Sequence, residues 1–285
     1  MHNISLTLTG QKVTAGGTRQ PVTKRMITRP WQALQPAGGT VCPFCPPERS
    51  GKLDKLEAQG EVIEWYPSKE NYKLVSLKNI FTPFLYHELL VPKDEHLWPS
   101  SVTELAEVLK IIFRILRERV FPVRGVESAQ FGFHHGQHAG QNMSHPHWHI
   151  IGSDWPTHSE CEWCEWRQKE SSILFKSESF VALLDGVRAG ETVIVSRVHH
   201  QKWEGKEDEI ADRLGQVVRL FQERFNNPDF IISSALESGG HFWLSYTPIL
   251  NQWGCTEVLA TRGLGPYAHP CSPEAMLQYL RTGKL

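Results

Sequence analysis

The order of motifs in the first half of the 285-residue chain recurs in the second half, and this recurrence constrains the fold more than any other feature. Each copy opens with a Cys-x-x-Cys pair, continues through a histidine and a helical segment, and ends on another histidine. Cys42 matches Cys161 at an offset of 119 residues, His96 matches His200 at 104, and His145 matches His241 at 96. Such ordered recurrence indicates a duplicated unit whose second copy has shorter loops.

Residue periodicity predicts the same kinds of element in both copies. A helix from Ser101 to Val120 begins with a Ser-x-x-Glu capping box, and a second helix covers Ile210–Phe225. β-Branched and aromatic runs predict strands at Glu61–Pro67, Tyr72–Leu77, Phe84–Pro92, Ser128–Phe133 and His145–Ile151, then at Ser172–Phe175, Phe180–Leu184, Thr192–Val198, Phe230–Leu236 and His241–Tyr246. Residues 1–41 are expected to form an extended arm with short strands. We predict an α+β fold with a unit boundary in the Ser153–Glu160 linker.

Charge and hydropathy exclude several classes of partner. Thirty Lys and Arg residues against 31 Asp and Glu residues give a net charge of −1, so no net basic field recruits nucleic acid or anionic lipid. No stretch approaches the roughly 18 apolar residues that span a bilayer. The first ten residues have neither the basic nor the apolar region of a secretion signal. We therefore expect a cytoplasmic protein with no nucleic-acid or membrane partner.

Six of the 14 histidines lie between His134 and His149, and three of them alternate in the sequence His145-Pro146-His147-Trp148-His149. In a strand, these three imidazoles would face one way, with about 7 Å between successive side chains. Pro146 cannot donate a ladder hydrogen bond, so the strand is expected to be an edge or to carry a bulge. The three side chains could bind a catalytic zinc ion, serve as nucleophile, orienter and acid in phosphoryl chemistry, or form an incidental polar face.

These residues resemble a known family. The segment GQNMSHPHWH at 140–149 is similar to the histidine-triad (HIT) signature, GQ-small-x-x-H-x-H-x-H. YHELLVPK at 86–93 and NIFTP at 79–83 resemble a strand and a turn of that superfamily. PVTK at 21–24, CPFCP at 42–46 and the HPH segment resemble the galactose-1-phosphate uridylyltransferase branch, which includes sugar-nucleotide phosphorylases. That branch implies two tandem HIT-like units, here residues 1–155 and 156–285, each an antiparallel sheet with a packed helix.

The resemblance implies a nucleotidyltransferase or phosphorylase that acts on a nucleotide sugar through a covalent nucleotidyl-histidine. It makes His147 the nucleophile, and His149 would stabilise or protonate the departing oxygen. The branch has Gln at the position of His149, whereas hydrolytic HIT proteins have His. A hydrolase of dinucleoside polyphosphates or nucleoside phosphoramidates is therefore an alternative, and a non-catalytic, zinc-stabilised nucleotide-binding protein is another. The resemblance also implies a homodimer.

The resemblance makes the first Cys pair part of a structural zinc site, with ligands Cys42, Cys45, His96 and His145. Two thiolates and two imidazoles form a closed tetrahedral site, which suits structure more than catalysis. A thiol–disulfide role would need a helix N-terminus to lower the thiol pKa, and no amphipathic helix is expected after this pair. The second copy retains equivalent positions for a second zinc ion, with His199 as the alternative to His200: Cys161, Cys164, His200 and His241. Alternatively, these cysteines pack among tryptophans.

The second copy has Trp243 at the position of the nucleophile and Ser245 at that of His149, so we expect it to be inert in nucleophilic chemistry. Substrate contacts are expected in the first copy. His134 lies where HIT proteins often place an Asn near the ribose or phosphate. The remaining candidates are an amide in the N-x-x-P turn, an amide that could reach phosphate oxygens and a hydroxyl beside the triad: Asn79, Gln141 and Ser144.

Overall fold

The computed structural model describes residues 6–8, 11–13, 42–49, 51–71, 73–79, 82, 84–93, 101–136, 139, 141, 143, 145–154, 163–164, 172–184, 190–199, 203–225, 229–236, 241–249 and 273–283. In this part of the chain, none of the helices combines the length and the apolar character needed to cross a membrane.

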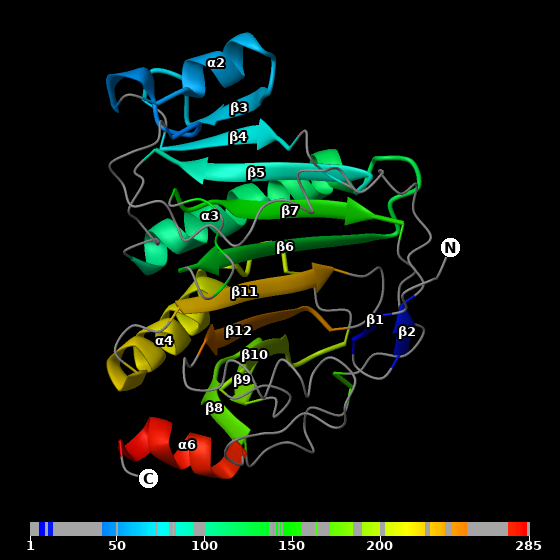
Figure 1. The fold of residues 1–285 in the computed structure, drawn as a ribbon. Helices are drawn as coiled ribbons and strands as arrows, with labels where there is room; N and C mark the ends of the chain where they lie inside the picture. Colours follow the sequence, from blue (N-terminus) through cyan, green and yellow to red (C-terminus); the bar gives the residue numbers. More distant parts are fainter. Residues whose placement is uncertain are drawn as a thin grey trace.

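A single ten-stranded antiparallel sheet organises the molecule (Figure 1). All ten strands expected in the two copies are present, which confirms the α+β class. In spatial order they are β3 (Val62–Tyr66), β4 (Leu74–Lys78), β5 (Tyr86–Pro92), β7 (Trp148–Ser153), β6 (Ser128–His135), β11 (Asp229–Leu236), β12 (Trp243–Ile249), β10 (Thr192–Ser196), β9 (Phe180–Leu184) and β8 (Ile173–Lys176). Within the arm, β1 (Leu6–Leu8) and β2 (Gln11–Val13) form a separate antiparallel pair.

The two halves of the sheet have the same strand order and the same register. Leu89 of β5 pairs with His149 of β7, and Val193 of β10 pairs with Ser245 of β12. These two pairs are related by the sequence offsets of 104 and 96. The outer pairs, β3–β4 and β8–β9, each carry one register shift at the corresponding place. The halves meet at β6 and β11, which pair antiparallel along their lengths.

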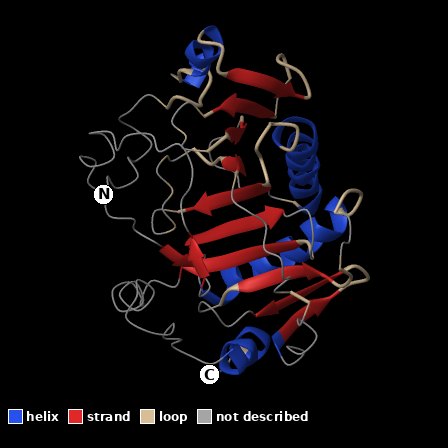
Figure 2. Cartoon of the chain, turned by 90° about the vertical axis from the view of Figure 1, so that its right-hand side faces the viewer, coloured by secondary structure: helices blue, strands red, loops and turns tan. Residues whose placement is uncertain are grey.

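The two long helices, α3 (Val102–Ile115) and α4 (Glu207–Phe225), lie on the same face of the sheet (Figure 2). Ser101 caps α3 by accepting a hydrogen bond from the Glu104 backbone N–H at 3.1 Å, and α3 continues as a π-helical turn, η2 (Leu116–Val120). One apolar core contains buried residues of both helices and of both halves of the sheet, including Phe113, Phe131 and Phe221. The halves are therefore not packed around separate cores on this face.

The opposite face of the sheet carries two smaller apolar clusters, one for each half. The first contains Phe44 between the two cysteines of the first pair, and the second contains Trp163 at the equivalent place. Phe44 and Trp163 thus pack on this face of the sheet, one in each half. After the first pair come the short 3-10 helix η1 (Pro47–Arg49) and the six-residue helix α2 (Leu53–Ala58), neither of which was predicted.

The predicted position of the triad strand needs correction. The sheet order places β7 between β5 and β6, so the triad strand is an interior strand and not an edge. Pro146 is compatible with this position because the ladder begins only at Trp148, after the proline that cannot donate to it. In addition, α6 (Pro273–Thr282) was not expected, and Arg281 at its end donates a hydrogen bond to the Ile173 carbonyl of edge strand β8 at 2.7 Å.

Candidate active site

The three triad histidines lie in three different environments. His145 and His147 precede β7 and are both buried, whereas His149 lies within the strand. The prediction that all three lie in one strand with about 7 Å between neighbours is wrong, because the strand begins only at Trp148 and both His145 and His147 precede it. The ring centroids of His147 and His149 are 4.7 Å apart. The side chains therefore divide into one that faces the cysteines and two that adjoin each other.

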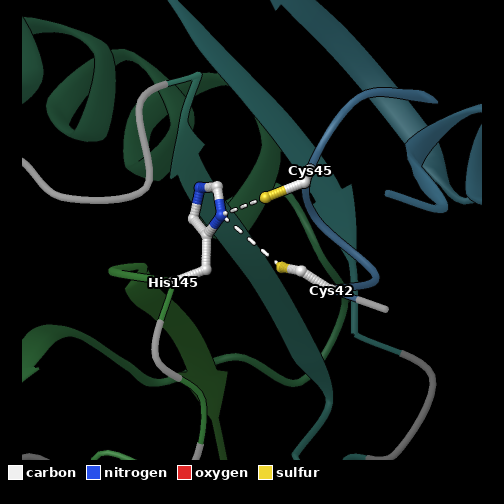
Figure 3. Close-up of side chains that lie close together, drawn as sticks. All are labelled: Cys42, Cys45 and His145. Atoms are coloured by element: carbon white, nitrogen blue, oxygen red, sulfur yellow. Dashed lines mark hydrogen bonds between the residues drawn. The ribbon is translucent and has the colours of Figure 1, made fainter. Parts of the chain in front are cut away.

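His145 faces the first Cys pair (Figure 3). Its Nδ1 lies 3.6 Å from the Sγ of Cys42 and 3.4 Å from the Sγ of Cys45, and its Nε2 donates to the Pro92 carbonyl at 2.7 Å. This hydrogen bond places the proton on Nε2 and directs the Nδ1 lone pair toward the sulfurs. Zinc–ligand distances imply a sulfur–nitrogen separation of about 3.6 Å in a tetrahedral site. The donor set and its spacing fit zinc; His96 lies outside the described residues.

A second cluster of possible metal ligands contains Cys164, His199 and His241. The Sγ of Cys164 is 3.2 Å from Nδ1 of His199, and His241 donates from Nδ1 to the Ser196 carbonyl at 2.7 Å. That bond leaves the Nε2 lone pair of His241 for a metal. The described ligand is thus His199, the alternative to His200, while Cys161 and His200 lie outside the described residues. Cys164 and His199 are exposed, whereas Cys45 and His145 of the first cluster are buried.

His147 has the features of a neutral nucleophile. It is 6% exposed, and its Nδ1 donates to the backbone carbonyl of His145 at 3.0 Å, so its lone pair is on Nε2. Burial, together with the nearby imidazoles of His145 and His134, lowers the pKa of His147 to about 4. The imidazole is therefore unprotonated at neutral pH, as attack on phosphorus requires. The Phe44 ring, 5.6 Å away between centroids, packs beside it.

His149 contacts a fourth imidazole, which the sequence motifs contain but the site prediction omitted. Its Nδ1 lies 2.9 Å from Nε2 of His87 on β5, and His87 Nδ1 lies 3.0 Å from the hydroxyl of Thr82. Burial lowers the pKa of His149 to about 2 and that of His87 to about 4, with repulsion from His147 as a further cause. The sequence could have indicated His87 through its place in the motif YHELLVPK. In the structure, His87 lies two residues before Leu89, which pairs with His149.

Of the residues predicted to contact the substrate, Asn79 and His134 lie beside the histidine cluster, and Gln141 bonds to the backbone. The amide nitrogen of Asn79 lies 3.3 Å from Nδ1 of His87, so Asn79 adjoins the histidine cluster. His134 lies near His149, with ring centroids 6.0 Å apart, and its Nδ1 donates to the Ala139 carbonyl at 2.7 Å. Gln141 accepts a hydrogen bond from the Gly136 backbone N–H at 2.7 Å. Ser144 lies outside the described residues.

The equivalent place in the second half is filled differently. Trp243, at the position of His147, packs on Trp163 with ring centroids 6.1 Å apart, just as His147 packs on Phe44. Ser245, at the position of His149, makes a hydroxyl–hydroxyl hydrogen bond of 2.8 Å with Ser233. An indole and a hydroxyl that is bonded within the sheet replace the two imidazoles of the first half.

Comparisons with known proteins agree with this architecture at the level of fold. No family model matches the sequence. Aprataxin of Ciona intestinalis is 28% identical over 125 residues, which cover 44% of this chain and 31% of that protein; the match thus spans less than a third of its length.

The chain superposes on a GalT-like protein of Arabidopsis thaliana with a TM-score of 0.69 and 17% identity, over 85% of this chain and 92% of that one. An ADP-glucose phosphorylase of Arabidopsis thaliana, solved with bound ADP-glucose, gives a TM-score of 0.68 and 16% identity over 92% and 95% of the two chains. A uridylyltransferase structure gives 0.66 and 14% over 96% and 95%. The resemblance to GalT-like HIT proteins is confirmed, and the fold is theirs.

Proposed function

We propose that this chain, which has the fold of GalT-like proteins, is a nucleotidyltransferase or phosphorylase that acts on a nucleotide sugar. The observation that carries the proposal is the state of His147: a buried, neutral imidazole whose Nδ1–H is bonded to a backbone carbonyl, with the lone pair on Nε2. ADP-glucose bound to a phosphorylase of the same fold supports a nucleotide sugar as the substrate class. Because His149 stands where the transferase branch has Gln, the acceptor is a sugar phosphate, inorganic phosphate or water.

The proposed organisation is two tandem HIT-like units, of which residues 1–155 are catalytic and residues 156–285 are degenerate. The matching registers of the two half-sheets support this division. Zinc in the first unit would be held by Cys42, Cys45 and His145, with His96 as the fourth ligand. When bound, zinc would fix His145, whose carbonyl orients His147. A second structural zinc would be held by Cys161, Cys164, His241 and either His199 or His200.

The proposed reaction has two displacement steps. Nε2 of His147 attacks the α-phosphorus of the nucleotide, a nitrogen–phosphorus bond forms, and the bond from phosphorus to the bridging oxygen breaks. His149 donates a hydrogen bond from Nε2 to the departing oxygen. The acceptor oxygen then attacks the same phosphorus, and the nitrogen–phosphorus bond breaks. Ser144 and the amides of Asn79 and Gln141 are proposed, with His134, to contact the nucleotide.

Intact-protein mass spectrometry tests this function. After brief incubation with UDP-, ADP- and GDP-sugars, the wild-type protein is expected to gain the mass of one nucleoside monophosphate. His147→Ala should gain none, whereas His135→Ala, on the same sheet, should behave like wild type. If the wild-type protein neither gains mass nor turns over any of these nucleotides while still binding one of them, the chain is a nucleotide-binding protein and the proposal fails.

A hydrolase of dinucleoside polyphosphates or nucleoside phosphoramidates is the second candidate, favoured by His149. The measurement that separates the two is the product formed with and without sugar phosphate or inorganic phosphate. Rapid release of nucleoside monophosphate in their absence indicates hydrolysis, and dependence on either acceptor indicates transfer. The implied homodimer in the cytoplasm is part of the same proposal, and light scattering of the purified protein would measure its mass.

A further inference from the structure

We propose that His87 is a positioning residue that holds His149 in the tautomer with its proton on Nε2, so that His149 presents an N–H to the departing oxygen. The proposal rests on the function proposed above. It assigns a role to a hydrogen-bonded chain, Thr82–His87–His149, that lies beside the nucleophile.

The strand register creates this contact. Leu89 is the residue of β5 that pairs with His149 of β7, and His87 lies two positions before Leu89 on the same face. Diagonal neighbours on adjacent antiparallel strands lie within reach of long or aromatic side chains. The rings of His87 and His149 meet with centroids 5.2 Å apart and nitrogens 2.9 Å apart. The pairing is thus fixed by the sheet and not by a loop.

Strand β5 is anchored from its other face, directly beside His87. The fully buried Glu88 accepts a hydrogen bond from Arg119 at 2.7 Å and another from the Tyr86 hydroxyl. Arg119 stands in the π-helical turn η2, and it also bonds Glu64 of β3 at 2.7 Å. A charge-assisted network of this kind restricts the backbone around position 87. His87 is therefore placed by a rigid element, as a positioning role requires.

The hydrogen bond with Thr82 indicates which ring nitrogen of His87 carries the proton, and therefore which nitrogen of His149 does. The Thr82 oxygen already accepts the Phe84 backbone N–H at 3.1 Å, and its own O–H can donate to Nδ1 of His87. The Asn79 amide nitrogen lies 3.3 Å from Nδ1 of His87 and 3.4 Å from its Nε2, so it does not distinguish the two ring nitrogens. A Thr82 O–H that donates to Nδ1 favours the form of His87 with its proton on Nε2. That proton is donated to Nδ1 of His149, and the proton of His149 is then on Nε2.

The consequence concerns the departing oxygen. His149 is faced by the imidazoles of His87, His134 and His147, so a positive charge on it would be both desolvated and repelled. A neutral ring can still donate a hydrogen bond, provided that the proton is on the nitrogen that faces the substrate. Without His87, the His149 proton would be distributed over both nitrogens, and stabilisation of the departing oxygen would be lost in proportion. The loss should grow with the basicity of that oxygen.

The test combines kinetics with a spectroscopic readout. Aryl esters of a nucleoside monophosphate, from the 4-nitrophenyl to the phenyl ester, vary the basicity of the leaving oxygen. His87→Leu is expected to lower kcat by roughly two- to threefold for the phenyl ester and less for the 4-nitrophenyl ester, with KM little changed. His87→Gln, which retains an N–H donor, should restore most of the loss. His135→Leu, the same substitution at an imidazole stacked on Phe230, should leave both rates unchanged.

Nitrogen-15 NMR of the histidine rings reports the tautomer without any reaction. In wild type, His149 should show a protonated Nε2 and an accepting Nδ1, and His87→Leu should replace this state by a mixture. An Nδ1–H form of His149 in wild type, or an equal kcat loss for both esters in His87→Leu, overturns the role of His87. Failure of the proposed function appears separately, as a wild-type protein that forms no nucleotidyl adduct.

Discussion

At the scale of single residues, hydrogen-bond partners distinguish four imidazoles that the sequence presents as similar. His145 is directed to two thiols, His147 to a carbonyl, and His149 to His87. Each partner fixes which ring nitrogen keeps its lone pair, and that nitrogen determines what the ring can do. The sequence motif thus identifies the histidines, whereas their hydrogen-bond partners determine which ring nitrogen of each is available.

Replacement of His149 by Gln restores the residue that the transferase branch has at this position, and so tests what the histidine contributes. Gln keeps an N–H donor but cannot transfer a proton. We expect His149→Gln to lower water-dependent release of nucleoside monophosphate by roughly tenfold or more, and to affect transfer to a phosphate acceptor less. Product analysis by chromatography measures both rates. An equal fall in the two rates would show that His149 does not discriminate between the acceptors.

The buried imidazoles also predict how stability depends on pH. Burial lowers the pKa of His87 to about 4 from an ordinary value of about 6.5. The unfolded chain therefore binds more protons than the folded chain between these values, and stability is lost as the pH falls through this window at about 1.4 kcal/mol per pH unit. Between pH 7 and pH 5, wild type should lose about 2 kcal/mol more than His87→Leu in urea unfolding. Parallel pH curves for the two proteins would contradict this pKa shift.

At the scale of elements, Phe44 and Trp163 pack into equivalent apolar clusters on the sheet face opposite the helices, one in each half. The cysteines that follow these two residues differ in exposure, because Cys45 is buried whereas Cys164 is exposed. Ligands of the same chemistry therefore lie in sites with different access to solvent.

Zinc release should reflect this difference. Metal analysis is expected to find up to two zinc ions per chain, and a chelating indicator should withdraw the ion of the exposed second cluster faster than that of the first. Cys164→Ser should remove the fast phase, and Cys45→Ser the slow phase. Cys45→Ser should also lower thermal stability more, since its ion closes a buried site. A single phase that neither substitution alters would contradict the assignment of these ligands.

At the scale of the whole molecule, the two halves share one sheet and one helix-side core. Helix α3 of the first half and helix α4 of the second contribute buried residues to the same cluster. The strands β6 and β11 join the halves through a continuous ladder. In the described part of the chain, the two half-sheets are thus joined by one ladder and covered by one core.

This shared core predicts a single unfolding transition. Phe221→Ala in α4 removes a fully buried ring that lies 5.2 Å from the Tyr246 ring between centroids, and should lower the free energy of unfolding by about 3–5 kcal/mol. Fluorescence and circular dichroism should still give one coincident transition, because loss of the second half exposes the core of the first. Two separate transitions, with the first half unaffected, would show that the halves unfold independently.

The sequence by itself determined the elements and their order. Apolar periodicity and the recurring motifs predicted ten strands and two long helices, because these signals depend only on neighbours along the chain. The HPH segment and the cysteines identified where the site lies. The sequence did not predict α2 or α6. It also predicted that the triad strand would be an edge or carry a bulge, because Pro146 was assumed to lie within the ladder.

Only the tertiary structure decided which residues meet. The contact of His87 with His149 joins positions 62 residues apart, and the contact of His145 with Cys45 joins positions 100 apart. Both contacts depend on strand register and on the fold of a loop over a sheet face, which long-range packing fixes and local sequence patterns do not encode. The chemical types of the site residues are therefore set by the sequence, whereas their protonation states and partners arise from the assembled sheet.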